Sequence, residues 1–359
     1  MSEIAFSICI PNYNYGEYIG ETIESVLSQS YPHFEIIVVD NASTDHSVEV
    51  VESFGSDKIR LFRNRYNIGF APNLQRVTMH ARNDFMNLLS SDDLMRPGAL
   101  ETYASILRSR GEEAHRTVLA SAVEVVDTEG TPVMMVGRAV DSFALRRYPL
   151  EHLESLRELP PYEDYEGRDV LADSLRRLTT SASFCTTVYP RRMWEEVEGY
   201  NGIRSMTPDT HFFLKLLSLE PTFTYVNRPL YAYRTHASNQ LSGQKSQRAV
   251  KFQLDQYLSS LELASLPLER YGLDSGRLER IYVTRALLTP ALVNLAKGDP
   301  LHALRLFSLA VATYPWVAFR TPLFYAVGAL LPLGPLARLV AWPMWRLFGG
   351  RTVPFEVQS

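Results

Sequence analysis

Cysteine is scarce in this sequence, since Cys9 and Cys185 are the only two in 359 residues. Two isolated cysteines exclude a disulfide framework and a cysteine-based zinc site. An excess of basic residues is lacking as well, because the formal net charge is -4 and the isoelectric point lies near 6.1. Nucleic acid is bound by concentrated basic surfaces, so DNA or RNA is not an expected partner.

Glycine-rich phosphate loops are also missing. No Gly-x-Gly-x-x-Gly follows the first apolar run, and no Gly-Lys-Ser/Thr loop occurs, which argues against dehydrogenases and NTPases. After Met-Ser-Glu the chain enters an apolar run directly, without a basic and then apolar leader. We therefore expect a cytoplasmic protein.

The composition is that of a globular protein, with 46% hydrophobic and 21% charged residues. Apolar runs predict short strands, and apolar residues at helical spacing predict helices between them. The expected strands are Ala5–Ile10, Phe34–Val39, Ile59–Phe62, Phe85–Leu89 and, later, Phe223–Val226; the expected helices are Ile19–Leu27, Ser47–Phe54, Asn73–Ala81 and Asp209–Leu219. This alternation predicts an α/β fold with a Rossmann-like, mostly parallel sheet and helices on both faces.

Three polar segments follow predicted strands. Asn12-Tyr13-Asn14 follows the first strand, Asp40 the second, and Ser90-Ser91-Asp92-Asp93 the fourth. Ligands of open α/β sheets bind outside the carboxyl ends of the strands, so we expect these segments to converge on one site.

The strings around these three segments, together with one further string, resemble the motifs of a known enzyme family. Ile10-Pro11-Asn12-Tyr13-Asn14, Val38-Val39-Asp40-Asn41-Ala42-Ser43-Thr44-Asp45, Ser91-Asp92-Asp93 and Pro208-Asp209 occur in the order seen in family 2 glycosyltransferases, which the chain resembles over about residues 5–240. The resemblance implies a GT-A fold. It also implies inverting transfer of a sugar from a UDP- or dTDP-sugar to an acceptor hydroxyl, in the synthesis of a cell-surface polysaccharide or glycoconjugate.

The resemblance assigns donor-binding roles. Asp40 would accept the imide hydrogen of uracil or thymine, although an Asp at this place can also form a turn before the next helix. Pro11 and Tyr13 would form a platform for the base. The other residues counted with the donor site are Asn14, Asn41, Asn67 and Ser91. Asp45 is expected to cap a helix instead.

Asp92 is the expected ligand of Mn²⁺ or Mg²⁺, because a carboxylate-bound divalent cation neutralises the diphosphate leaving group. Similar enzymes usually read Asp-x-Asp here, whereas this chain has Ser90 at the first position. Ser90 in place of the first Asp removes one acidic contact from the expected metal and donor site. The alternative is that Asp92 and Asp93 belong to an ordinary polar loop without a metal.

Asp209 matches the general base of the family's Glu-Asp pair, with Pro208 in place of the Glu. An Asp that opens a helix is also a common cap, so that alternative stays open. Tyr233-Arg234-Thr235-His236 loosely resembles a string that closes over the diphosphate. His236 is therefore a candidate metal ligand and Arg234 a candidate phosphate clamp, although an isolated loop His often has no such role.

The expected domains are residues 1–245, the GT-A domain, and residues 246–359, a helical module. Thr321–Ala337 holds no charge, is shorter than the roughly 20 residues of a spanning helix, and contains Pro322, Pro332 and Pro335. Its flanks carry cations and indoles, namely Arg320, Arg338, Arg346, Trp316, Trp342 and Trp345. We expect peripheral contact with the inner face of the plasma membrane, near a glycan or polyprenyl-diphosphate-linked acceptor. A buried helical subdomain or a homodimer interface are the alternatives.

Two other functions stay open. A nucleotidyltransferase would use a similar sheet, but its Gly- and basic-rich loop is absent from the sequence. A non-catalytic nucleotide-sugar-binding scaffold at a membrane is conceivable because Ser90 and Pro208 replace acidic residues.

Overall fold

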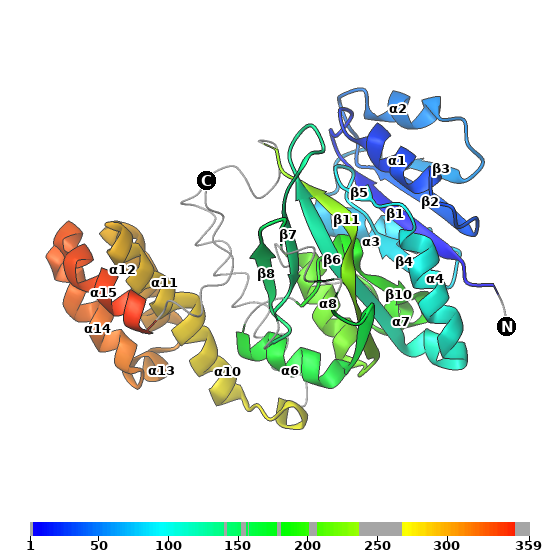
Figure 1. Cartoon of the computed structure of the whole chain (residues 1–359). Helices are drawn as coiled ribbons and strands as arrows, with labels where there is room; N and C mark the ends of the chain where they lie inside the picture. Colours follow the sequence, from blue (N-terminus) through cyan, green and yellow to red (C-terminus); the bar gives the residue numbers. More distant parts are fainter. Residues whose placement is uncertain are drawn as a thin grey trace. The chain divides into compact units, whose positions relative to one another are not determined.

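The computed structural model describes residues 3–139, 142–151, 156, 158–177, 181–200, 207–236 and 268–348. The chain divides into two compact units (Figure 1). The first comprises Met1–Leu171 and Thr180–Ser242, and the second Ala172–Thr179 and Gly243–Ser359. Each unit contains a hydrophobic core of its own.

A mostly parallel sheet organises the first unit. Its main path runs β3 (Ile59–Arg63), β2 (Phe34–Asp40), β1 (Phe6–Asn12), β4 (Phe85–Leu88), β10 (Val188–Pro190), β6 (Thr117–Val126), β11 (Thr222–Arg234) and β5 (Leu94–Met95). Strands β3, β2, β1 and β4 are parallel neighbours, as are β6 and β11, whereas β10 and β5 pair antiparallel. The strands β7 (Pro132–Arg138), β8 (Leu145–Tyr148) and β9 (Tyr162–Glu166) extend the sheet beside β6 and β11.

Alternate residues of each strand point to opposite faces of this sheet, and helices bury the apolar side chains on both faces. Ile8, Ile10 and Val38 are buried in one core cluster with residues of α1 (Ile19–Leu27), α2 (Ser47–Ser53) and α4 (Ala99–Arg110). Cys9 and Val39 are buried on the other face, where α3 (Phe70–Met79) packs against β1 and β2. The predicted α/β fold is therefore confirmed. The remaining helices of this unit are η1 (Gly111–Arg116), η2 (Phe184–Thr186), α7 (Arg191–Glu196) and α8 (Pro208–Ser218). Helix α6 (Gly167–Arg177) begins in this unit, and its residues from Ala172 on belong to the second.

Strand β11 is much longer than the expected Phe223–Val226. It shifts register at Pro229 and then continues along β6, until Arg234 lies opposite Val126. A proline lacks the backbone donor that a regular ladder needs, so the apolar pattern breaks there although the strand goes on. The extension carries Arg234 and His236 towards the end of β6.

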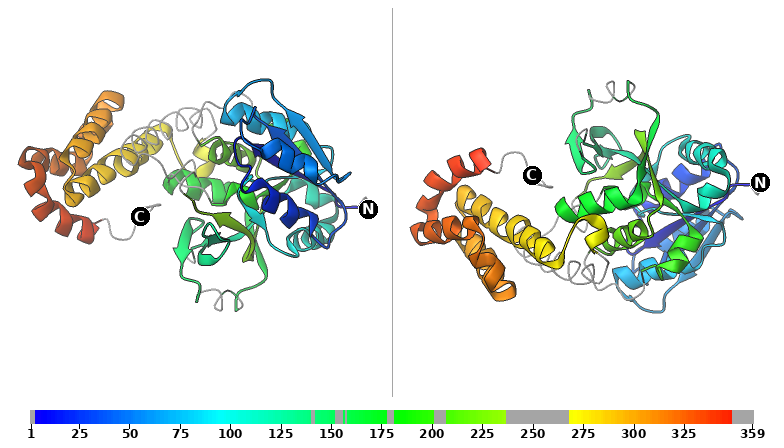
Figure 2. Two further views of the ribbon diagram at one scale, coloured as in Figure 1. Left: turned by 90° about the horizontal axis from the view of Figure 1, so that it is seen from above. Right: turned by 90° about the horizontal axis from the view of Figure 1, so that it is seen from below.

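The second unit is a helical bundle. Its elements are η3 (Leu268–Tyr271), α10 (Ser275–Tyr282), the π-helical η4 (Val283–Leu288), α11 (Thr289–Lys297), α12 (Pro300–Thr313), α13 (Pro315–Phe319), α14 (Pro322–Leu330), η5 (Leu331–Ala337) and α15 (Arg338–Phe348). Asp274 and Asp299 cap α10 and α12 with hydrogen bonds from Arg277 N and His302 N. Small and aliphatic residues such as Leu287, Leu306 and Ala310 fill its core. The yellow-to-red helices of Figure 2 confirm the predicted C-terminal helical region.

Candidate active site

The site lies at the carboxyl ends of β1, β2 and β4. Parallel pairing sets Asn12 beside Asp40 and Cys9 beside Leu88, so the three strands end at one edge. The segments that follow them start from that edge together, as the sequence predicted.

Asp40 is buried and held firmly in place. Asn12 Nδ2 donates to Asp40 Oδ1 at 2.9 Å, and Ser43 N donates to Asp40 Oδ2 at 2.9 Å. Ser43 Oγ in turn accepts hydrogen bonds from Asn12 Nδ2 and Asn14 N. Each carboxylate oxygen can accept a further hydrogen bond, so a fixed Asp40 can receive the N–H of a bound ligand.

The segment after β1 is tied to the one after β2. Asn14 takes a left-handed conformation with φ 57°, and its Oδ1 accepts a hydrogen bond from Thr44 N at 2.8 Å. The side chain of Asn14 thus holds the two loops together. Pro11 is half-buried, and Tyr13 is 42% exposed, which leaves its ring accessible for stacking.

Asn41 organises the segment between β3 and α3. Its Oδ1 accepts hydrogen bonds from Asn64 Nδ2 and Ile68 N, and its Nδ2 donates to Asn67 Oδ1 at 2.9 Å. Asn67 Oδ1 also accepts from Gly69 N, where a φ of 90° requires a glycine. The hydrogen bond between the Asn41 and Asn67 side chains therefore helps to fix the conformation of this loop.

Asp92 and Asp93 are both buried in the loop after β4, whose turn is closed by a bond from Asp93 N to Ser90 O. Asp92 Oδ2 lies 3.1 Å from His236 Nε2, and Asp93 Oδ1 accepts a hydrogen bond from Arg234 N at 3.1 Å. Burial raises the pKa of Asp92, although the hydrogen bond with His236 opposes the rise. Burial and the neighbouring charge of Asp92 raise the pKa of Asp93 well above its ordinary range. Ser91, between Ser90 and this pair, is buried as well.

Arg234 is the largest fully buried side chain of the described residues. Its Nε donates to Asp92 O at 3.2 Å, its Nη1 to Thr128 O at 2.8 Å and its Nη2 to Glu21 Oε2 at 2.5 Å. All three nitrogens therefore have protein acceptors, and they connect the segments after β4 and β6 with α1 at the site. The phosphate-clamping role of Arg234 stays a prediction.

Three residues of the site were missed from the sequence, and all come from the start of α1 or just before it. The His236 ring stacks on Tyr18 with a centroid distance of 4.5 Å, and Tyr15 meets it edge-on at 5.8 Å. Arg234 Cζ lies 5.3 Å from the Tyr18 centroid, and Glu21 forms the ion pair with Arg234. Polar and aromatic residues at the start of a helix resemble an ordinary exposed helix face, so no sequence signal marked them.

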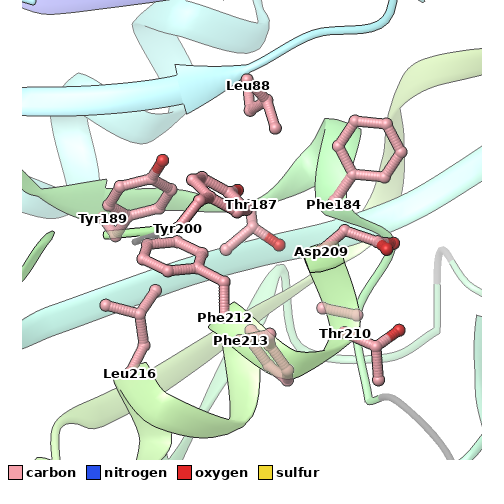
Figure 3. Close-up of a pocket in the computed structure, with 11 residues that line it drawn as sticks. Leu88, Phe184, Thr187, Tyr189, Tyr200, Asp209, Thr210, Phe212, Phe213 and Leu216 are labelled. Carbon is pink, nitrogen blue, oxygen red and sulfur yellow. The ribbon is translucent and has the colours of Figure 1, made fainter. Parts of the chain in front are cut away.

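Asp209 lines a pocket on α8 (Figure 3). The helix begins at Pro208, and its N-cap residue Thr207 makes no capping hydrogen bond through its side chain. Figure 3 shows the Asp209 carboxylate on the Phe184 side of the pocket, which is otherwise mostly aromatic and apolar. Leu88, the last residue of β4, also lines the pocket, so Asp209 is next to the strand that leads to Asp92. The pair Asn201-Gly202, which is typical of a turn before this helix, lies outside the described residues.

The side chains at this site supply only part of the coordination that a divalent cation needs. Among the residues that the structure describes, no group of three or more His, Cys, Asp or Glu is placed to hold a metal. Asp92 and His236 nevertheless converge, and they offer one oxygen and one nitrogen. Mg²⁺ in particular is commonly held by one or two carboxylates together with substrate phosphates and water, so this pair is compatible with a cation that arrives with a diphosphate.

Comparisons with known proteins match the first part of the chain to one family. Residues 7–114 match the model of glycosyl transferase family 2. Glycosyltransferase GlyG of Streptococcus pneumoniae is 33% identical over 104 residues, which are 28% of this chain and 34% of GlyG. Poly(ribitol-phosphate) beta-N-acetylglucosaminyltransferase TarS of Staphylococcus aureus is 29% identical over 134 residues, which are 36% of this chain and 23% of TarS. The chain spans less than half the length of these relatives.

The likeness in structure extends further along the chain. The crystal structure of S. aureus TarS 1-349 in complex with UDP-GlcNAc has a TM-score of 0.62 and covers 96% of this chain and 92% of that chain. The complex of the same protein with UDP has a TM-score of 0.59. Sequence identities of 16% and 17% mean that these matches show a shared fold alone.

Proposed function

We propose that this chain is a family 2 glycosyltransferase, the family whose model its residues 7–114 match, and that it catalyses an inverting, metal-dependent sugar transfer. The donor would be a UDP- or dTDP-sugar and the acceptor a hydroxyl group. The observation that supports this proposal best is the meeting of Asp40 and Asp92 at one edge of parallel strands, with Asp209 in a pocket beside the end of β4.

The donor residues would act as follows. Asp40, fixed by Asn12 and Ser43, would accept the imide N–H of the base, and Tyr13 would stack on its ring. Asp92 and His236 would hold Mn²⁺ or Mg²⁺, which as a Lewis acid neutralises the diphosphate leaving group. Arg234 would keep Asp92 and Asp93 in place through its bonds to Asp92 O and Asp93 Oδ1.

The acceptor side would depend on Asp209. As a general base, this carboxylate would take the proton of the attacking hydroxyl group. A single displacement needs no second carboxylate as covalent nucleophile, and it inverts the anomeric centre. The name of TarS describes transfer onto a poly(ribitol-phosphate) polymer, which supports a cell-surface glycan as the acceptor. A lipid-linked acceptor on the cytoplasmic side belongs to the same proposal.

Ligand-dependent melting of the full chain tests the donor. We expect UDP- or dTDP-sugars, and not GDP-sugars, to raise the Tm in the presence of Mn²⁺, because a ligand at 100 times its Kd stabilises the folded state by about 2.7 kcal/mol. The same donor should be hydrolysed slowly without acceptor. If no nucleotide sugar shifts the Tm, the proposal is wrong. Binding without hydrolysis or transfer would favour the scaffold, and pyrophosphate release from a nucleoside triphosphate would favour the nucleotidyltransferase.

A further inference from the structure

The second unit exposes large apolar side chains on α13, α14, η5 and α15. The term apolar surface is used below for six of these exposed side chains, namely Trp316, Tyr325, Leu333, Leu336, Leu339 and Trp342. Trp316 is 76% exposed, Leu336 66% and Leu339 68%. The bundle core is filled by other residues, such as Leu306, Ala310 and Leu330, whereas the side chains of the apolar surface stay largely exposed.

The charge of this region has one sign. From Pro300 to Pro354 the sequence contains no Asp or Glu, and its charged residues are arginines. Arg320, at the C-terminal end of α13, and Arg338, the first residue of α15, are exposed on helices that carry the apolar surface, and Arg305 is exposed on the preceding α12. Exposed Trp and Leu beside Arg, with no carboxylate nearby in sequence, match an anionic partner that also accepts apolar side chains.

The most apolar part of this region is not one straight helix. In the described part of the chain, one stretch, Pro322–Met344, is long and apolar enough to cross a membrane, with a mean hydropathy of 1.6. Gly334 breaks it with φ 53° and ψ -133°, and Pro335 and Pro343 lie beyond the break. The stretch therefore consists of the separate helices α14 and α15, joined through η5, which suit a position on a bilayer better than a path across it.

We propose that the apolar surface binds an anionic lipid bilayer, with Trp316 and Trp342 at the level of the headgroups and Arg320 and Arg338 against the lipid phosphates. A second copy of this chain is a poorer occupant, because a self-complementary interface would bring arginines together without a carboxylate from these helices. The contact itself rests on this surface alone. Its consequence, delivery of the active site to a lipid-carried acceptor, rests on the proposed function.

Vesicle flotation of the full chain tests the proposal. We expect binding to phosphatidylcholine vesicles that contain phosphatidylglycerol, weaker binding to phosphatidylcholine alone, and a blue shift of tryptophan fluorescence. The double variant Leu336→Ser/Leu339→Ser should reduce the partition coefficient roughly tenfold or more, since each exposed Leu contributes buried CH₂ groups. The matched control is Met79→Ser/Val133→Ser, two exposed apolar residues of the first unit, which should bind as the unaltered chain does.

Charge variants distinguish binding to anionic lipid headgroups from nonspecific hydrophobic adsorption to vesicles. Arg320→Gln/Arg338→Gln should remove the preference for phosphatidylglycerol, whereas Arg82→Gln/Arg192→Gln should keep it. A full chain that never floats overturns the proposal. Concentration-dependent self-association that Leu336→Ser/Leu339→Ser abolishes would instead assign the surface to a second copy. Melting with nucleotide sugars, run on the same samples without vesicles, shows independently whether the donor site works, so either proposal can fail alone.

Discussion

His236 Nε2 lies 3.1 Å from Asp92 Oδ2, although the two residues are 144 positions apart in the chain. Strand β11 brings the histidine to the loop after β4, and the ring of Tyr18 supports it from α1. A carboxylate and an imidazole that face each other in a buried place can share a proton or a divalent cation. Two predictions follow from this arrangement, one for Asp92 and one for the arginine that positions it.

Replacing Asp92 by Asn should abolish sugar transfer without unfolding the protein. The amide keeps the size of the side chain but removes the charge that would hold a cation, so we expect turnover to fall at least about a hundredfold, or about 2.7 kcal/mol. Stability should hold or rise, because burial disfavours the ionised carboxylate. Turnover with saturating Mn²⁺ and circular-dichroism melting measure the two effects, with the exposed Asp169→Asn as control. Near-normal turnover of Asp92→Asn would remove Asp92 from the metal site.

Replacing Arg234 by Lys should destabilise the protein and weaken donor binding together. Lysine keeps the charge, but it lacks the planar fork that reaches Asp92 O, Thr128 O and Glu21 at once. Each buried acceptor left unpaired costs about 1–3 kcal/mol. Urea unfolding and nucleotide-sugar melting shifts measure these losses. Glu21→Gln is the companion variant; if it matches Arg234→Lys in stability, the ion pair at α1 carries the whole effect, whereas we expect a smaller loss because Glu21 is largely exposed.

The placement of Asp40 and Asp92 at one edge of the sheet could be predicted because it depends on strand ends. Asp40 and Asp92 each follow a short apolar run, and parallel strands that end at one edge must bring such residues together. Glu21 could not be found in this way, since its partner Arg234 lies 213 residues further along the chain. Strand β10, with three residues, is too short to show a periodicity, and β11 passes through a proline that breaks its pattern. These pairings depend on tertiary packing, which the local pattern does not record.

Asp45 should stabilise the protein at neutral pH and lose that effect in acid. Burial alone would raise its pKa, but hydrogen bonds from Ser47 and from Gly16 N outweigh burial and lower the pKa. The folded state then binds the proton less tightly than the unfolded chain, whose carboxyl titrates at about 3.9. The stabilisation is therefore complete above that value and disappears as the pH falls through the lower folded pKa.

Asp45→Asn tests this linkage. The amide cannot accept hydrogen bonds at both of its ends, so we expect the variant to melt below the unaltered chain at about pH 7 and the difference to shrink on acidification. Exposed Asp57→Asn should show no such trend. A Tm difference for Asp45→Asn that does not change with pH would show that the carboxylate charge is unimportant here.

Replacing Asp209 by Asn separates a general base from a residue that only stabilises the start of α8. Thr207 is the N-cap of α8 and Asp209 lies in its first turn, where a carboxylate stabilises the helix by about 0.3–1 kcal/mol, so a purely structural Asp209 predicts an active variant that is at most slightly less stable. The proposed base predicts something else: donor-dependent melting shifts stay, because Asp209 acts on the acceptor, while transfer falls by about 10²–10⁴-fold. Asp274 and Asp299 serve as controls from the start of other helices, since they are N-caps with hydrogen bonds from Arg277 N and His302 N. Asp274→Asn and Asp299→Asn should leave both Tm and transfer unchanged; if Asp209→Asn behaves as they do, the pocket on α8 needs another base.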